Sequence, residues 1–194
     1  MSPEPDPLSQ AKAILRRDAA LRRDAAHLVD GPTAADGLIR HGLDALAALR
    51  PRVVSGFWSI RSEIDVRPLM LALASTTGAG LAMPVVMGRG QPLIFRRWQP
   101  DTALVEGPFG TAHPAESEPV LTPDLVLVPL LAFDRQRRRL GYGAGFYDRT
   151  LAGLRAAGPV TAVGIAYGAQ EVAAVPVGDH DERLDLVLTE RGII

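Results

Sequence analysis

The 194-residue sequence contains no cysteine, and this absence excludes several kinds of chemistry. Disulfide bonds, a thiolate nucleophile and a cysteine-ligated zinc site all require that side chain. Long hydrophobic runs are missing as well: the apolar stretch from Leu125 to Phe133 has nine residues, one of them proline, whereas a membrane-spanning helix needs about 20. A metal would therefore be held by oxygen or histidine ligands, and we expect no membrane partner.

The chain also has little net charge and almost no lysine. The formal net charge is −1, and of the 21 basic residues 20 are arginine, so that Lys12 is the sole lysine. Proteins that bind nucleic acid through a general positive field carry a large positive charge. RNA binding through the arginine cluster at 135–139 is an alternative, but the near-zero charge and the lack of an RNP-like strand pattern argue against it, and we expect no nucleic-acid partner.

The N-terminal residues 1–7 are rich in proline and acidic residues, which predicts a disordered tail. They lack the basic and then apolar pattern of a secretory signal, so a cytoplasmic location is expected. The remaining residues, 8–194, have the length of one domain.

The order of apolar patterns predicts an α/β fold. Two amphipathic helices are expected at 8–28 and 33–49, the second with Thr33 as its N-cap and Pro51 beyond its end. Strand-like and helical runs then alternate, which favours a mostly parallel sheet covered by helices. Strands are predicted at 52–58, 81–86, 93–98, 125–129, 160–167 and 184–188, and helices at 68–75 and 145–157. The segment around 88–90 predicts an antiparallel hairpin, and the proline-rich segment 99–123 is expected to be functional.

The segment FDRQRRRLGYGAGFYDR, residues 133–149, lies between a predicted strand and a predicted helix. Gly141, Gly143 and Gly145 allow backbone amides to approach an anion, and the following helix offers its N–H groups and positive dipole end. Phosphate is the natural ligand, although a purely structural glycine turn is the alternative. Arg139 stands two residues before this turn, and Asp148 follows it, where it either caps the helix or reaches a magnesium ion.

On the first predicted helix, Lys12 and Arg16 are four residues apart and share a face. Two like charges at this spacing repel one another weakly, and an anion placed between them would remove the repulsion. A solvated basic face is the alternative interpretation.

Three sequence blocks, SGFWSIRSEIDVRPL (55–69), FDRQRRRLGYGAGFYDRTL (133–151) and EVAAVPVGDHDERLDLVLTE (171–190), resemble the 5-formyltetrahydrofolate cyclo-ligase family. This family is also called methenyltetrahydrofolate synthetase. The resemblance implies a three-layer α/β/α sandwich and a ligase of one-carbon metabolism. It implies the conversion of 5-formyltetrahydrofolate to 5,10-methenyltetrahydrofolate with ATP and magnesium, releasing ADP and phosphate.

The resemblance also implies roles for individual residues. Arg139 and Tyr147 are expected to be catalytic. The nucleotide is expected to contact Lys12, Arg16, Arg139, Gly141, Tyr142, Gly143, Ala144, Gly145, Phe146 and Tyr147. For the folate, Glu63 matches the acid that accepts the pterin N–H groups, and Trp58, Phe109 and Tyr147 offer flat apolar surfaces. The expected magnesium ligands are Asp148 and Asp181, with Asp179 and Asp185 as alternatives.

Two residues depart from the family pattern. Some relatives carry basic residues within the glycine loop where this chain has Tyr142 and Ala144. The phosphates would then have one or two fewer cationic contacts, unless neighbouring arginines compensate. The alternative function is therefore a related protein that binds nucleotide or folate without cyclising it. We expect a monomer or a weak homodimer.

Overall fold

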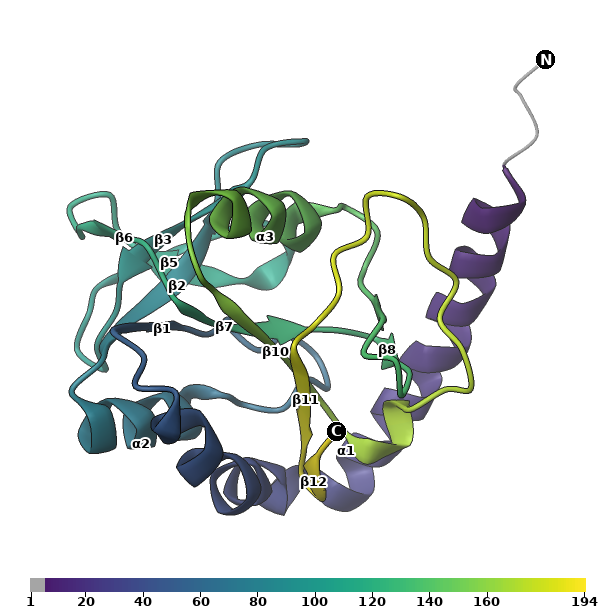
Figure 1. Ribbon diagram of the computed structural model, residues 1–194, viewed down its shortest axis with the longest axis horizontal. Helices are drawn as coiled ribbons and strands as arrows, with labels where there is room; N and C mark the ends of the chain where they lie inside the picture. The colour runs from purple at the N-terminus through teal and green to yellow at the C-terminus, as the bar shows by residue number, and fades with distance from the viewer. Residues whose placement is uncertain (1–5) are drawn as a thin grey trace.

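The computed structural model describes residues 6–194, apart from the side chain of Phe109, and an eight-stranded sheet forms its centre (Figure 1). Residues 1–5 of the predicted tail lie outside the described residues. The strands of the sheet follow one another in space as β12 (Gly192–Ile193), β11 (Leu186–Thr189), β10 (Thr161–Ala166), β7 (Leu125–Pro129), β1 (Val53–Ser55), β2 (Gly80–Val86), β3 (Leu93–Arg97) and β6 (Val120–Leu121).

The middle of this sheet is parallel and its edges are antiparallel. β11, β10, β7, β1 and β2 pair in parallel, and β12, β3 and β6 are added antiparallel at the two edges. β7 is the unbroken apolar run LVLVP, as expected for a strand covered on both faces. β2 and β3 form the antiparallel hairpin predicted around 88–90, where Gly90 adopts a left-handed φ of 79°.

Helices cover both faces of the sheet, which confirms the predicted three-layer α/β/α arrangement (Figure 1). α3 (Phe146–Ala157) lies on one face, where Leu151 packs with Val126 and Val128 of β7. α1 (Pro7–Ala48) and α2 (Arg67–Thr77) lie on the other, where the larger core includes Leu38, Leu69 and Leu73. None of the helices formed by residues 6–194 combines the length and the hydropathy needed to cross a membrane.

The prediction of two separate N-terminal helices is wrong, because α1 is one helix of 42 residues with Pro32 inside it. It begins at Pro7, within the predicted tail, and Asp6 caps it by accepting hydrogen bonds from the backbone N–H groups of Leu8 and Ser9. The ring of Pro32 is exposed, so water can reach the carbonyl group that loses its donor. The helix bends, and its two halves run along different sides of the molecule (Figure 1).

Burial explains why this helix continues past its local stop signals. Ala34, Gly37 and Leu38 follow the proline and are all buried. A Cβ atom at Gly37 would lie 2.6 Å from the carbonyl oxygen of Glu190, so the helix packs directly on the backbone that follows β11. Tertiary packing thus overrides the weak preference of Thr33 for an N-cap.

The segment 99–123 is not structureless. It holds β4 (Leu104–Glu106), the short 3-10 helix η1 (Pro108–Gly110) and β5 (Ala112–Pro114), and it ends in β6. β4 and β5 form a two-stranded pair. A second pair, β8 (Ala132–Phe133) and β9 (Arg139–Leu140), leads into the glycine turn, and a short 3-10 helix, η2 (Gly168–Gln170), follows β10.

Candidate functional site

A cavity of about 540 Å³ opens where β7, the glycine turn, the N-terminal half of α1 and the loop after β1 meet. With the exceptions of Phe109 and the two alternative magnesium ligands, every residue singled out above as catalytic, ligand-binding or metal-binding lines this cavity. These residues are Lys12, Arg16, Trp58, Glu63, Arg139, Gly141, Tyr142, Gly143, Ala144, Gly145, Phe146, Tyr147, Asp148 and Asp181. The side chain of Phe109 lies outside the described part of the chain. Neither Asp179 nor Asp185 lines the cavity.

The glycine turn joins β9 to α3 and presents the backbone of its three glycines to the cavity. Gly143 and Gly145 have φ angles of 103° and 66°, which other residues rarely adopt. Gly145 is also the N-cap residue of α3, and no described side chain caps that helix end. Its first N–H groups therefore point at the cavity without a protein partner, in the arrangement in which helix N-termini bind phosphate.

Two cations from α1 approach this turn. The Nε atom of Arg16 donates a 2.9 Å hydrogen bond to the carbonyl oxygen of Gly141. The same guanidinium lies over Gly143, where a Cβ atom would be 3.1 Å from its Cζ atom. Its two terminal nitrogens have no hydrogen-bond partner within the described chain, so they remain available to an anion. Lys12, one helical turn earlier, forms an ion pair with Asp181.

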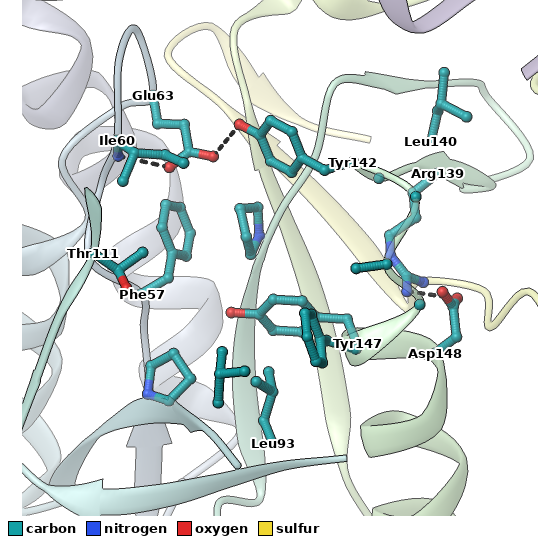
Figure 2. Close-up of a pocket in the computed structure, with 18 of the residues that line it drawn as sticks. Phe57, Ile60, Glu63, Leu93, Thr111, Arg139, Leu140, Tyr142, Tyr147 and Asp148 are labelled. Atoms are coloured by element: carbon teal, nitrogen blue, oxygen red, sulfur yellow. Dashed lines mark hydrogen bonds and ion pairs between the residues drawn. The ribbon is translucent and has the colours of Figure 1, made fainter. Parts of the chain in front are cut away.

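Asp148 anchors the start of α3 to Arg139. Its Oδ1 atom accepts a 2.7 Å hydrogen bond from Arg139 and a 3.1 Å hydrogen bond from the backbone N–H of Glu182, while Oδ2 meets no described donor (Figure 2). Arg139 is buried and also donates to the carbonyl oxygen of Glu182. Asp148 can therefore serve in both of the expected roles. Its Oδ1 atom holds the start of α3 in place, and its Oδ2 atom is available to a magnesium ion.

Asp181 also has hydrogen-bond donors at one carboxylate oxygen only. Its Oδ2 atom accepts hydrogen bonds from Lys12 and, at 2.7 Å, from the backbone N–H of Gly178, while Oδ1 has no described donor. Burial acts to raise the pKa of this carboxyl group, but the hydrogen bonds from Lys12 and Gly178 outweigh it and hold the pKa below its ordinary value. The carboxylate therefore stays ionised beside the cavity at neutral pH.

A complete metal site made of protein groups alone is not present in the part of the chain that the structure describes, where no group of three or more acidic or histidine side chains gathers. Magnesium is commonly held by one or two carboxylates together with substrate phosphates and water. Asp148 and Asp181 fit that requirement. The alternative ligand Asp185 is instead bound to Arg155 and to the backbone N–H of Ala162 at 2.8 Å.

The other end of the cavity is apolar. Its walls are formed mainly by Phe57, Ile60, Leu93 and Tyr147 (Figure 2). Pro84 and Val86 also line the cavity. Tyr147 is partly buried, and the loss of water around its hydroxyl group raises the pKa of that group well above the ordinary value. Trp58 lies at the rim with the guanidinium of Arg67 4.6 Å from its ring centre. A flat aromatic ligand of moderate polarity suits such walls.

One carboxylate faces this apolar end. Oε2 of Glu63 accepts a 2.9 Å hydrogen bond from the backbone N–H of Ile60, and Oε1 accepts one from the hydroxyl group of Tyr142 (Figure 2). Arg23 approaches Oε1 to 3.6 Å. Burial raises the pKa of Glu63 above its ordinary value, although Tyr142, Ile60 and Arg23 each act to lower it.

Arg23 was not among the predicted site residues. It is 2% exposed, donates a 2.9 Å hydrogen bond to Ser62 and donates another to the hydroxyl group of Tyr142. Lys12, Arg16 and Arg23 are spaced four and seven residues apart, which places them on one face of α1. That spacing is the sequence signal that could have identified Arg23.

The sequence from residue 8 to residue 190 matches the model of the 5-formyltetrahydrofolate cyclo-ligase family. The 5-formyltetrahydrofolate cyclo-ligase of Mycolicibacterium smegmatis is 35% identical over 155 residues, which cover 74% of this chain and 76% of that protein. The enzyme of the same name from Haemophilus influenzae is 29% identical over 153 residues, covering 76% of this chain and 81% of that protein.

Solved structures agree with these matches. The NMR structure of 5,10-methenyltetrahydrofolate synthetase from Aquifex aeolicus superposes with a TM-score of 0.74 at 27% identity, covering 94% of this chain and 91% of that one. The corresponding protein of Mycoplasma pneumoniae has the same fold, with a TM-score of 0.68 at 21% identity and coverage of 92% and 98%.

Proposed function

Because this chain belongs to the 5-formyltetrahydrofolate cyclo-ligase family, we propose that it converts 5-formyltetrahydrofolate to 5,10-methenyltetrahydrofolate with ATP and magnesium. The observation that carries this proposal is that the glycine turn and the Glu63 carboxylate open into one cavity. One end of that cavity has donors and cations for phosphates, and the other has apolar walls and a single acceptor for a pterin.

At the phosphate end, the backbone of the glycine turn and the N-terminus of α3 bind the phosphate oxygens. Arg16, with its two free terminal nitrogens beside Gly143, neutralises part of their charge, and Lys12 and Arg139 stand close by. Asp148 and Asp181 each keep one oxygen that would hold a magnesium ion, and the ion would neutralise charge on the phosphates. Arg16 and Arg139 thus supply positive charge beside the glycine turn. The turn itself has Tyr142 and Ala144 where some relatives carry basic residues.

At the apolar end, Glu63 accepts hydrogen bonds from the pterin, and Tyr147 and Phe57 pack against its rings. With the pterin bound in this way, the formyl group lies between the apolar end and the phosphate end of the cavity. The formyl oxygen attacks the γ-phosphorus, and ADP leaves. N10 then bonds to the formyl carbon and loses its proton to water, and the carbon–oxygen bond breaks as phosphate departs with the oxygen. The protein supplies position, charge and exclusion of water rather than a covalent nucleophile. The absence of cysteine is consistent with such a mechanism.

A turnover assay tests the proposal. The absorbance of 5,10-methenyltetrahydrofolate is followed with both ATP and magnesium present and with each left out, while ATP binding is measured separately by calorimetry. We expect product only when both are present. ATP binding without product under any condition would overturn the proposal in favour of a non-cyclising binding protein, the alternative raised by Tyr142 and Ala144.

A further inference from the structure

The outer face of the N-terminal half of α1 carries large apolar side chains that no other part of the described chain covers. Ile14, Leu21 and Leu28 are 56%, 69% and 82% exposed, and Val29 beside them is 78% exposed. Single exposed apolar residues are common, but a row of them on one helix marks an interaction surface. This half of the helix runs along the edge of the molecule (Figure 1).

Ile14, Leu21 and Leu28 are seven residues apart. They lie on the face of α1 opposite to the face that packs against the rest of the protein. The inner face of the same segment carries Ala19, Arg23 and Ala26, which are buried.

Large aliphatic side chains seven residues apart form one seam along a helix, which a second helix can cover. This seam is narrower than that of a coiled coil, because Arg17, Asp18 and Asp24 stand three or four residues from Leu21. The repeat covers two intervals, which is the length of a short helix pair.

Charged residues flank this seam in a definite order. By helical geometry Arg17 and Asp24 lie on one side of it, and Asp18 and Arg22 lie on the other. Arg17, Asp18 and Arg22 are exposed and form no ion pair with any part of the described chain. Each flank thus carries one positive and one negative group, and of these Asp24 also accepts a hydrogen bond at Oδ1 from the hydroxyl group of Ser62.

We propose that this seam binds a second copy of the chain, with the two α1 helices antiparallel and the two-fold axis beside Leu21. In this arrangement Leu21 meets the partner's Leu21, and Ile14 meets the partner's Leu28, because the spacing is symmetric about Leu21. An antiparallel two-fold pair brings each flank against the same flank of its partner. Arg17 then faces the partner's Asp24, and Asp18 faces the partner's Arg22, so both flanks are complementary.

The dimer leaves the cavity open. Lys12 and Arg16 face the glycine turn from the opposite side of α1, so this inference does not depend on the proposed function. A seam of one helix buries less than the roughly 1,200 Å² typical of stable interfaces, so the dimer forms reversibly and depends on concentration.

Cysteine cross-linking tests the pairing, because the chain has no cysteine of its own. Under mild oxidation, Leu21→Cys alone forms a disulfide-linked dimer, since the two Cα atoms meet at the axis. Ile14→Cys and Leu28→Cys do not cross-link alone but cross-link when the two variants are mixed. Leu49→Cys is the matched control, because Leu49 is also an exposed leucine but caps the C-terminal end of α1, away from this face.

Each other outcome overturns the proposal. Self-linking of Ile14→Cys would show a parallel pair. Equal cross-linking of Leu21→Cys and Leu49→Cys would show random collisions, and no cross-linking in any variant would show that the face is unoccupied by a second copy.

Sedimentation of the unmodified chain gives an independent measurement. Leu21→Glu weakens self-association about tenfold or more, because it places carboxylates in the seam, and Leu49→Glu does not. Asp18→Arg weakens self-association and the double change Asp18→Arg, Arg22→Asp restores it. A chain that stays monomeric at every concentration, or a double change that fails to restore association, contradicts the antiparallel pair.

Discussion

The hydroxyl group of Tyr142 donates a hydrogen bond to Oε1 of Glu63, so the glycine turn is in direct contact with the carboxylate proposed to bind the pterin (Figure 2). The other oxygen of Glu63 accepts the backbone N–H of Ile60 at 2.9 Å. Both oxygens therefore already have a donor. A pterin that approaches Oε1 shares this oxygen with the Tyr142 hydroxyl group, which couples the departure of this loop residue from the family pattern to folate binding.

Removing that hydroxyl group is expected to tighten folate binding. In Tyr142→Phe, Glu63 no longer has the competing donor, and KM for 5-formyltetrahydrofolate falls about fivefold at pH 8, as expected for one hydrogen bond of about 1 kcal/mol. Tyr167→Phe is the matched control, because Tyr167 contacts His27 and does not line the cavity. A rise in KM for Tyr142→Phe, measured by steady-state kinetics, would show that the hydroxyl group binds the folate instead.

Folate turnover should be lost at low pH, and the pKa of Glu63 should set the pH at which the loss occurs. Burial raises the pKa of this group above its ordinary value of 4.5, and only the ionised form accepts hydrogen bonds at both oxygens. The value of kcat/KM for folate therefore falls as the pH drops through the raised pKa. Arg23 acts to lower this pKa, so Arg23→Met moves the acid limb of the pH profile to higher pH.

Two variants complete that experiment. Glu63→Gln removes the acid limb that Glu63 causes, and Arg22→Met, a change of the neighbouring exposed arginine, leaves the limb in place. An acid limb at the same pH in Arg23→Met as in the unmodified chain would mean that Arg23 is only a packing residue.

Arg16 is expected to bind ATP rather than folate. Its hydrogen bond to Gly141 directs the free terminal nitrogens of the guanidinium toward the glycine turn. Arg16→Met should raise KM for ATP about tenfold or more, because a hydrogen bond to a charged group contributes about 1.5–3 kcal/mol, and should leave KM for folate unchanged. Arg40→Met, an exposed arginine on the same helix away from the cavity, is the control. An unchanged KM for ATP in Arg16→Met contradicts the prediction.

The magnesium requirement should depend on Asp148. Asp148→Asn is expected to raise the magnesium concentration needed for half-maximal rate about tenfold or more, since a unit charge a few ångströms from the ion contributes more than ~1.4 kcal/mol. It also lowers Tm, because Arg139 loses its counter-charge. Asp185→Asn is the control: it also breaks a pair with an arginine, Arg155, but outside the cavity. If the two variants lower Tm alike and neither changes the magnesium requirement, Asp148 is a capping residue only.

Most elements of the fold were predictable because their local patterns agree with their tertiary setting. The strand at 125–129 was predicted with its observed bounds, since only a strand buried on both faces needs five consecutive apolar residues here. The N-terminal helices were predicted wrongly because Pro32 and Thr33 give local signals for a boundary. Those signals are outweighed by the burial of Leu38 and by the contact of Gly37 with Glu190, which no local pattern records.

The site was predictable to a similar degree. The glycine turn has a local signature, and the four-residue spacing of Lys12 and Arg16 gives a weaker one. The resemblance to a family added Glu63, and all of these residues line the cavity. Arg23 was missed because a buried arginine on a helix has the same local pattern as the exposed arginines around it. Its partner Tyr142 is 119 residues away in the sequence, so only the folded chain shows that the two form one cluster with Glu63.

The glycine turn itself provides a matched pair of substitutions. Gly143 has a φ angle of 103°, and a Cβ atom there would lie 3.1 Å from Cζ of Arg16. Gly143→Ala therefore strains the backbone by about 1–2 kcal/mol and displaces the guanidinium, so KM for ATP should rise about tenfold or more. At Gly141 a Cβ atom meets nothing within 4 Å, and the carbonyl group that binds Arg16 is retained. Gly141→Ala should keep its affinity for ATP, measured by calorimetry, and an equal loss in both variants would show that the conformation of Gly143 is not what places Arg16 at the phosphates.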